Sequence, residues 1–257
     1  MKIIVCIKAV RGDYVSGDIK DQTSFVINPY DLLALQTVIN KRIKEKDQVV
    51  CLSMGGPNIK DALVKSIAIG VDDVYWLCDS NFAGADTIAT SYVLAESIKK
   101  IGEGDLIVCG GKTVDGETGQ VGIGISERLG IPCITNVDDI IRLDDKSIVV
   151  KCINDREQTV VKADFPVMVI LRKFTTVTSN MSLLALKSAQ RKKMNVWGAD
   201  TIKLDKEKCG IRGSKTQVLE VVSDLHKKNV CMVEGEVSDK VKFLDELLLK
   251  RSVLYNG

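Results

Sequence analysis

The stretch of sequence that says most about the fold is Val108-Cys109-Gly110-Gly111-Lys112-Thr113-Val114-Asp115-Gly116-Glu117-Thr118-Gly119-Gln120-Val121-Gly122-Ile123-Gly124. It begins in a short apolar run, residues 106–109, which predicts a buried strand. Residues 120–129 predict a helix that ends at Gly130. This order of strand, glycine-rich loop and helix places free backbone N–H groups and the positive end of a helix dipole at the carboxyl edge of a sheet. Such an edge suits a phosphate or pyrophosphate.

The glycine-rich loop alone does not distinguish a ligand site from an ordinary turn. Close approach of a bulky anion to the backbone would explain the glycines at positions 110, 111, 116 and 119. However, the loop matches neither GxxxxGKS nor GxxxxGKT, and no GxGxxG directly follows the strand. Loose glycine motifs also occur without a ligand. A plain strand-to-helix turn is therefore an equal alternative at this point.

Strand and helix signals alternate four times in the first half of the chain. Such alternation predicts an α/β fold with a parallel sheet, helices on both faces and a ligand crevice outside the carboxyl ends of the strands. Four loops should meet there, and the corner at residues 28–31 can close the rim. The predicted strands are 3–10, 48–53, 73–78 and 106–109, and the predicted helices are 28–44, 58–69, 87–101 and 120–129.

The second half of the chain predicts a β-hairpin and an extended C-terminal arm. We expect two domains: residues 1–198, with a partner-recognition loop near 175–190, and an arm with a final helix, 199–257, that packs on a partner subunit. Leu183, Leu184 and Leu186 either belong to the core or form an exposed docking knob. The predicted strands are 133–140, 142–152, 158–163 and 165–171, and the predicted helices are 182–189 and 240–251.

Composition excludes several classes of function. The net charge of +2 and the 5% aromatic content give no basis for nucleic-acid binding. No apolar segment is long enough to span a bilayer, and we expect a cytoplasmic protein. The eight cysteines form no CxxC, so a metal or iron–sulfur site is not expected. The one histidine, His226, precludes a histidine-based metal centre and is expected to be solvated.

Several motifs in this order resemble the β subunit of electron-transfer flavoproteins over essentially the whole chain. The most specific is 110–122 with Leu129-Gly130-Ile131-Pro132 after it. The others are Lys2 to Lys8, Asn28-Pro29-Tyr30-Asp31, Ser53-Met54-Gly55-Gly56-Pro57 and Ala68-Ile69-Gly70-Val71-Asp72.

The resemblance implies a Rossmann-like domain that forms a heterodimer with an α subunit and holds an adenine nucleotide in its crevice. The site residues carried over by motif come from the first strand, the corner, the second strand and the glycine loop. They are Cys6, Asn28, Pro29, Tyr30, Asp31, Met54, Gly110, Gly111, Lys112, Thr113, Val114, Asp115, Gly116, Glu117, Thr118, Gly119, Gln120 and Val121.

In ordinary members of the family the nucleotide is structural AMP, and in electron-bifurcating members it is a second FAD. Residues 115–122 and the turn 82–90 look like the bifurcating type. The small residues of that turn leave room for an isoalloxazine ring, which Asp86, Thr87 and Thr90 can hydrogen-bond. The alternative for this turn is a helix N-cap without a ligand.

A bifurcating subunit implies NADH as the hydride donor. One electron would pass through the FAD of the α subunit to an acyl-CoA or 2-hydroxyacid flavin dehydrogenase, and the other to ferredoxin or flavodoxin. No catalytic side chain is expected, because the hydride chemistry belongs to the flavin. Whether such a subunit is an enzyme by itself stays open. The alternatives are an AMP-containing, non-bifurcating subunit and, from another class, an ATP-binding or adenylating module, against which the missing P-loop and the long arm both argue.

Leu183 lies where the family has its recognition loop, which anchors the partner dehydrogenase. The sequence departs from the family pattern next to it, because Leu184 stands where a proline is common. The resemblance therefore implies Leu183 as a partner-binding residue but does not indicate which dehydrogenase binds.

Overall fold

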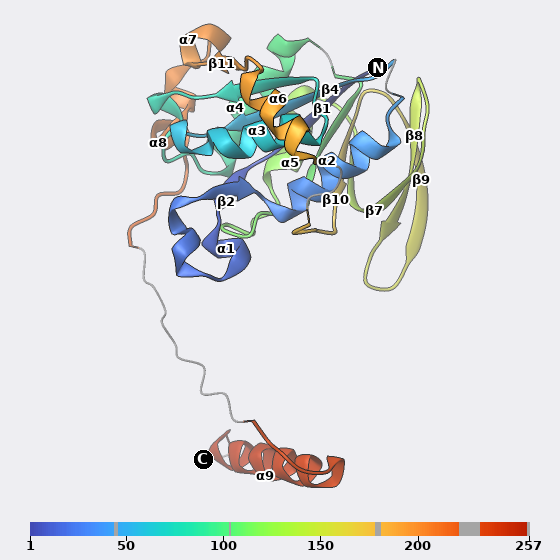
Figure 1. Ribbon diagram of the computed structural model, residues 1–257, viewed down its shortest axis with the longest axis vertical. Coiled ribbons are helices and arrows are strands. Elements are labelled where there is room, and N and C mark those ends of the chain that lie inside the picture. Colours follow the sequence, from blue (N-terminus) through green and yellow to red (C-terminus); the bar gives the residue numbers. More distant parts are fainter. Residues whose placement is uncertain (44–45, 103, 178–180, 221–231, 256–257) are drawn as a thin grey trace. The chain divides into compact units, whose positions relative to one another are not determined.

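The computed structural model describes residues 1–43, 46–102, 104–177, 181–220 and 232–255 (Figure 1). The chain forms two compact units, Met1–Gln217 and Val218–Gly257. In the second unit the described structure is the helix α9 (Val237–Tyr255), which includes the predicted final helix. His226 lies outside the described residues.

The first unit is built on a nine-stranded sheet with the order β11-β5-β4-β1-β6-β10-β7-β8-β9. The strands from β11 to β7 pair in parallel, and β8 and β9 continue the sheet antiparallel. The central strands are almost wholly apolar because helices cover both of their faces. The bounds are β1 (Lys2–Cys6), β4 (Gln48–Met54), β5 (Asp73–Leu77), β6 (Leu106–Gly110), β7 (Cys133–Leu143), β8 (Ser147–Ile153), β9 (Gln158–Asp164), β10 (Val167–Leu171) and β11 (Asn195–Trp197).

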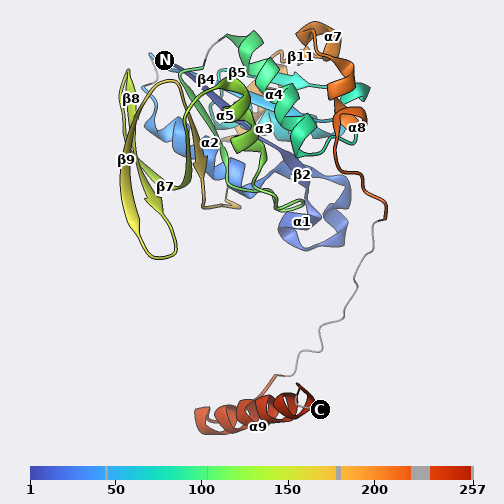
Figure 2. The same cartoon turned by 180° about the vertical axis from the view of Figure 1, so that it is seen from behind.

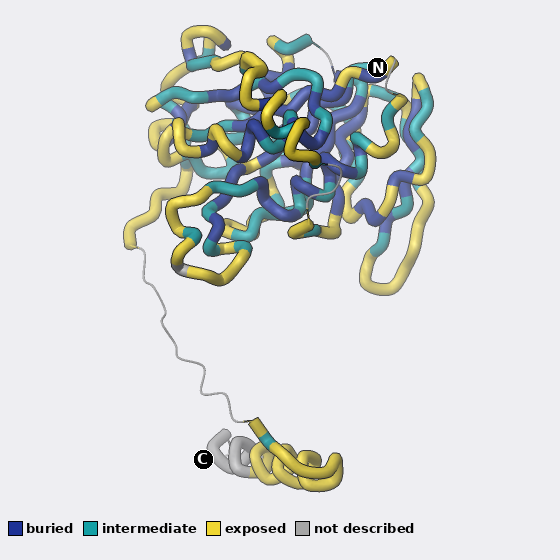
Figure 3. Tube along the Cα trace, in the orientation of Figure 1, coloured by how far each residue is buried: buried dark blue, intermediate teal, exposed yellow. Residues whose placement is uncertain are grey.

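Two pairs of helices sandwich the sheet (Figures 1 and 2). The helices α2 (Pro29–Lys41) and α3 (Lys60–Ile69) share one apolar core with alternate residues of the strands, such as Ile3 and Val5. The helices α4 (Thr87–Ile101) and α5 (Val121–Leu129) share the other core, which includes Ile4. Figure 3 shows the buried residues concentrated between these layers. The predicted α/β fold is confirmed.

The predicted strand 3–10 is wrong in extent. It divides into β1, in the main sheet, and β2 (Ala9–Arg11), which pairs antiparallel with β3 (Phe25–Ile27) in a separate small sheet. The chain leaves the main sheet at Lys8, whose backbone binds Asn28 and Asp31 instead of a neighbouring strand. The segment between β2 and β3 contains α1 (Asp13–Ser16) and the 3-10 helix η1 (Ile19–Thr23).

Other elements follow the predicted order with shifted ends. Helix α2 ends at Lys41, and Lys44, the predicted end, lies outside the described residues. The predicted second helix begins with a 3-10 turn, η2 (Pro57–Ile59), and a further 3-10 turn, η3 (Ser80–Phe82), precedes α4. The predicted hairpin is confirmed as β8 and β9, which β7 extends to three antiparallel strands. The predicted helix 182–189 is α6 (Leu183–Arg191).

Residues 199–213 are packed rather than extended. They form α7 (Ala199–Ile202), the 3-10 helix η4 (Lys206–Lys208) and α8 (Gly210–Gly213). Three buried side chains, Ala199, Ile202 and Cys209, join the core on the side of α4. The first unit thus includes residues that the sequence predicts to be part of the arm. Contact of residues 199–257 with a partner subunit stays a prediction. Among the helices described, none combines the length and apolarity that a membrane crossing requires.

Candidate functional site

A buried polar corner joins three segments at the carboxyl edge of the sheet. The carboxylate of Asp31, in the first turn of α2, accepts hydrogen bonds from the backbone N–H groups of Lys8 (2.9 Å) and Gly110 (2.8 Å). It also accepts a hydrogen bond from the side-chain amide of Asn28 (3.0 Å). Lys8 follows β1 and Gly110 ends β6, so Asp31 connects two neighbouring strand ends with α2.

Asn28 extends this corner into the glycine loop. Its amide group donates to the carbonyl oxygen of Lys112 (2.9 Å), and its side-chain oxygen accepts from the N–H of Val114 (3.2 Å). Among the described residues no side chain caps α2 at Asn28, and Asp31 binds distant backbone groups instead of the start of its own helix. The corner therefore fixes the shape of the loop at residues 112–114.

Burial raises the pKa of Asp31 to about 6, although hydrogen bonds from Lys8, Asn28 and Gly110 oppose the rise. Cys6, at the end of β1, is buried beside this carboxylate, and burial followed by the nearby Asp31 charge raises the pKa of its thiol far above the ordinary value. Cys6 is therefore a neutral, small apolar side chain under the corner.

Gly110 is required by close packing. A Cβ atom at this position would lie 2.5 Å from the Cβ of Tyr30 and 2.7 Å from the backbone nitrogen of Asp31. The loop also contains two residues with positive φ, Glu117 (52°) and Gly119 (64°), a region of φ that favours glycine. The loop thus owes its path to glycines at a tight contact and at a turn.

The far part of the loop is exposed and leads to a helix end without a cap. Two ion pairs cross it, between Lys8 and Asp115 (2.6 Å) and between Lys112 and Glu117 (3.4 Å). Within the described part of the chain no side chain caps α5 at Gln120. The N–H groups of the first turn of α5 thus stay available at the carboxyl edge, where an anion is favoured.

The start of α4 forms the opposite rim. One oxygen of Asp86 accepts from the N–H groups of Ile88 and Ala89, both at 2.9 Å, and so caps α4. The other oxygen accepts from Lys215 (2.7 Å) and Thr216 (3.1 Å). The N-cap alternative for this turn is therefore present in the structure, and contact of Asp86 with a cofactor stays a prediction.

The predicted site residues gather around one edge to different degrees. Thr87 donates its hydroxyl hydrogen to the side-chain oxygen of Gln120 (2.9 Å), which joins the rim to the glycine loop. Tyr30 packs its ring 5.2 Å from that of Phe174, with the ammonium group of Lys112 at 5.8 Å from the Tyr30 ring. The partly buried residues Met54 and Thr90 lie at the end of β4 and in the first turn of α4. Ligand contact of all these residues stays a prediction.

Leu183 belongs to a different region. It begins α6, which contacts α3, and its side chain is 81% exposed; that of Leu184 is 80% exposed. Leu186 is partly buried against the small core between α3 and α6. Two of the three leucines are thus outside the core, whereas the docking role of Leu183 stays a prediction.

Sequence reasoning missed three contributors to this edge. They are the backbone of Lys8, the segment 214–216, and Thr175, whose N–H donates to the carbonyl oxygen of Pro29 (3.1 Å). The contributions of Lys8 and Thr175 are backbone bonds, and the segment lies far along the chain from Asp86. No local pattern in the sequence signals such contacts.

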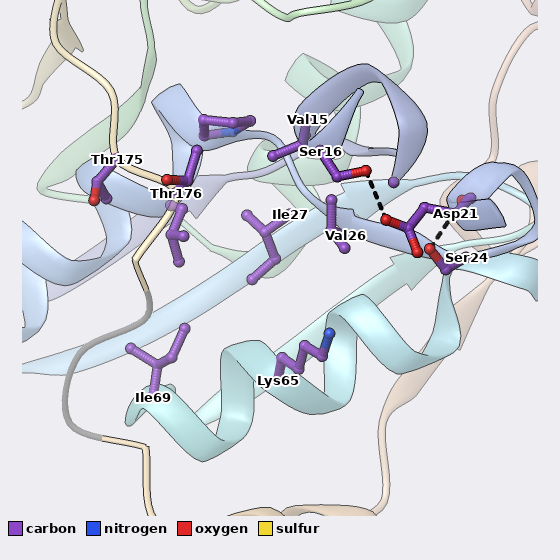
Figure 4. A pocket seen from close by; sticks show the side chains of 13 residues that line it. Val15, Ser16, Asp21, Ser24, Val26, Ile27, Lys65, Ile69, Thr175 and Thr176 are labelled. Carbon is purple, nitrogen blue, oxygen red and sulfur yellow. Dashed lines mark hydrogen bonds between the residues drawn. The ribbon is translucent and has the colours of Figure 1, made fainter. Parts of the chain in front are cut away.

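A cavity of about 380 Å³ lies beside this edge rather than in it. Its walls come from residues 12–27, α2, α3 and Thr175-Thr176 (Figure 4). Figure 4 shows Ser16 and Ser24 bonded to Asp21 on one side, with Lys65 and Ile69 on α3. The lining includes Pro29 of the corner but no residue of the glycine loop. In the part of the chain that the structure describes, no group of three or more His, Cys, Asp or Glu side chains could hold a metal ion.

Comparison with known proteins shows the family of the chain. Residues 17–201 match the electron transfer flavoprotein domain. The chain is 35% identical over 247 residues to the electron transfer flavoprotein subunit beta of Clostridium acetobutylicum, covering 93% of each chain. It is 33% identical to subunit CarD of the caffeyl-CoA reductase–Etf complex of Acetobacterium woodii, covering 94% and 95% of the two chains. It is 36% identical to protein FixA of Azorhizobium caulinodans, covering 86% and 84%. The chain belongs to the electron transfer flavoprotein family, among its β subunits.

Proposed function

We propose that the chain is the β subunit of an electron-bifurcating electron transfer flavoprotein and that the edge described above binds FAD. The observation that carries the proposal is the uncapped start of α5 beside a glycine loop fixed by Asn28 and Asp31. Free N–H groups at a helix start that follows a glycine-rich loop are what a pyrophosphate requires.

The residues present fit a dinucleotide. The first turn of α5 and the exposed loop residues 115–119 would bind the phosphates, and the corner at Asn28 to Asp31 would flank the adenosine. The rim at residues 82–90 would face the isoalloxazine ring. There hydrogen bonds within the protein occupy both oxygens of Asp86 and the hydroxyl hydrogen of Thr87. Within the described residues Thr90 has no such side-chain partner, so we assign to Thr90 the side-chain bond to the ring.

When bound, FAD would supply the redox chemistry of this site, which is to accept a hydride from NADH and to release electrons one at a time. The side chains of this subunit would bind and orient it. Cys6 and Cys109, two buried thiols that are close enough to Asp31 to be affected by its charge, stay protonated because burial raises their pKa. We further propose that the partner subunit is an α subunit. The electron acceptors would be a flavin dehydrogenase and either ferredoxin or flavodoxin. The relative CarD, by its name a subunit of a caffeyl-CoA reductase–Etf complex, supports a dehydrogenase-type partner.

The first prediction concerns the nucleotide. The heterodimer with the α subunit should release two FAD and no AMP per αβ pair after denaturation, because the 82–90 turn and the 115–122 loop resemble the bifurcating type. Chromatography of the released nucleotides against protein concentration measures this ratio. One FAD and one AMP per pair would contradict bifurcation and favour a β subunit with structural AMP, whose single phosphate the same helix start would suit.

A further inference from the structure

Asp86 forms more hydrogen bonds than a helix cap needs. The oxygen that caps α4 accepts from Ile88 and Ala89. A single side-chain oxygen is sufficient for an N-cap, and Asn or Ser does this about as well as Asp. The second carboxylate oxygen is therefore free for another purpose.

That second oxygen binds a segment more than a hundred residues away. It accepts from the N–H groups of Lys215 (2.7 Å) and Thr216 (3.1 Å) and lies 3.3 Å from the hydroxyl of Thr216. In return, the N–H of Asp86 donates to the hydroxyl oxygen of Ser214 (2.8 Å). Hydrogen bonds to an ionised carboxylate are roughly twice as strong as neutral ones, so this contact can fix an exposed segment.

The position of the bound segment gives the contact its meaning. Residues 214–216 lie at the end of the first unit, and the second unit begins at Val218. Val218 is 82% exposed, so the packing of the first unit stops here. On the other side, Thr87 binds Gln120 of the glycine loop. A short chain of bonds thus connects the loop, the rim and the end of the first unit.

We propose that Asp86 is a positioning residue that attaches residues 214–216 to the rim of the crevice and so fixes the point from which the C-terminal segment leaves the first unit. This role differs from the cofactor contact expected from the sequence. It rests on the proposed function only in naming the crevice as the FAD site. Burial alone would raise the pKa of Asp86, but the N–H groups of Ala89, Lys215, Thr216 and Ile88 outweigh burial and lower it, so the carboxylate is ionised at neutral pH.

The test is amide hydrogen exchange in the full chain with Asp86→Asn. An Asn oxygen can still cap α4, but its NH2 group then faces the N–H groups of Lys215 and Thr216 and cannot accept from them. Exchange at these two amides should become about tenfold faster or more, while exchange at Ile88 and Ala89 should change much less. A residue that only caps a helix would not give this difference in exchange between the amides bound to its two oxygens.

The matched control is Asp18→Asn. Asp18 also caps a helical turn, by accepting from the N–H of Lys20 (3.0 Å), and among the described residues it forms no hydrogen bond with residues 214–216. The Asp18→Asn variant should show the same amide hydrogen exchange at Lys215 and Thr216 as the wild type. Unchanged exchange at these amides in Asp86→Asn would overturn the proposal.

Should Asp86→Asn loosen the whole first unit, Asp86→Ser decides. The single hydroxyl of a serine can still cap α4 and leaves no second oxygen for the N–H groups of Lys215 and Thr216. Faster exchange at Lys215 supports the proposal, and wild-type exchange there overturns it. FAD titration of the same proteins separates the two roles of Asp86: a large loss of FAD affinity with unchanged exchange would make it a cofactor ligand. A wild-type heterodimer without FAD at this site would contradict the proposed function and leave the exchange result standing.

Discussion

At the corner of Asn28 and Asp31 the polar side chains are buried and hydrogen-bonded, whereas at the start of helix α6 Leu183 and Leu184 face solvent. Asn28 has no exposed surface and Asp31 has 5%. Their bonds join residues up to 86 positions apart. Leu183 and Leu184 show the opposite arrangement, because their apolar side chains are exposed to water. They begin a helix that is capped by Ser182, its neighbour in the sequence.

The difference indicates what each region is for. A buried polar corner is stable in one arrangement only, since each lost partner leaves a desolvated group behind. Its substitution should therefore affect folding first. Two adjacent exposed leucines contribute little to folding and are typical of a surface that another molecule covers. Their substitution should affect association first, and the predictions below test this division.

The largest effect is expected from Gly110→Ala. The new Cβ would meet the backbone of Tyr30 at 2.6 Å and cannot be accommodated by moving a flexible side chain. We expect a loss of about 3 kcal/mol or more in the free energy of unfolding. Urea unfolding followed by tryptophan fluorescence measures it, because both tryptophans, Trp76 and Trp197, lie in the first unit.

Gly116→Ala is the matched control in the same loop. The nearest atom to its new Cβ is the hydroxyl oxygen of Thr113, at an ordinary 3.6 Å. Its effect should stay within about 0.5 kcal/mol. Equal losses in the two variants would show that the corner is not tightly packed against Gly110.

A smaller effect on stability is expected from Asp31→Asn. The N–H of either Lys8 or Gly110 would then face the NH2 group of the new Asn side chain. This should lower the free energy of unfolding by about 1–3 kcal/mol at pH 7. The pH dependence gives a second signature. The pKa of Asp31 is raised from 3.8 to about 6, so the folded state binds this proton more tightly than the unfolded state does. The free energy of unfolding of the wild type therefore rises as the pH falls from about 6 to 3.8.

The difference in the free energy of unfolding between wild type and Asp31→Asn should therefore widen from pH 6 to pH 4. It should widen by at most about 1.4 kcal/mol per pH unit. Unfolding curves at several pH values measure the gap. A gap that narrows on acidification would mean that the carboxylate has a lowered pKa and that hydrogen bonding outweighs burial at the corner.

The sequence predicts the main sheet well because its strands are continuous apolar runs separated by helices with regular apolar faces. It does not predict β2 and β3, since three-residue strands such as Ala9–Arg11 carry no periodic signal and depend on a partner strand elsewhere. For the same reason the packing of residues 199–213 is missed. Its apolar residues, such as Ile202 and Cys209, are too widely spaced to show a helical face.

For the candidate site, the sequence points to Asn28 and Asp31 but not to the hydrogen bonds that they form. Asn28 and Asp31 stand where helix caps are common, so a local interpretation is natural. The structure instead uses them for contacts with Lys8, Gly110 and Lys112. Contacts between residues distant in sequence depend on the packed sheet, and a single sequence does not contain that information.

The smallest effect on stability is expected from Leu183→Ala. A side chain that is 81% exposed loses little packing when truncated, so the free energy of unfolding should change by less than about 0.5 kcal/mol. If Leu183 fills a pocket on the flavin dehydrogenase, the same change should weaken binding by about 2 kcal/mol, or roughly thirtyfold. Flavin content should stay unchanged.

Leu63→Ala is the matched control for Leu183→Ala. Leu63 is fully buried in α3, the helix that α6 contacts, and its truncation should cost about 2–5 kcal/mol of stability. Titration of the dehydrogenase and thermal unfolding of both variants measure the two effects. Unchanged dehydrogenase binding by Leu183→Ala would remove the docking role from this residue. A stability loss as large as that of Leu63→Ala would mean that Leu183 packs inside the protein, and α6 would then resemble the corner instead of contrasting with it.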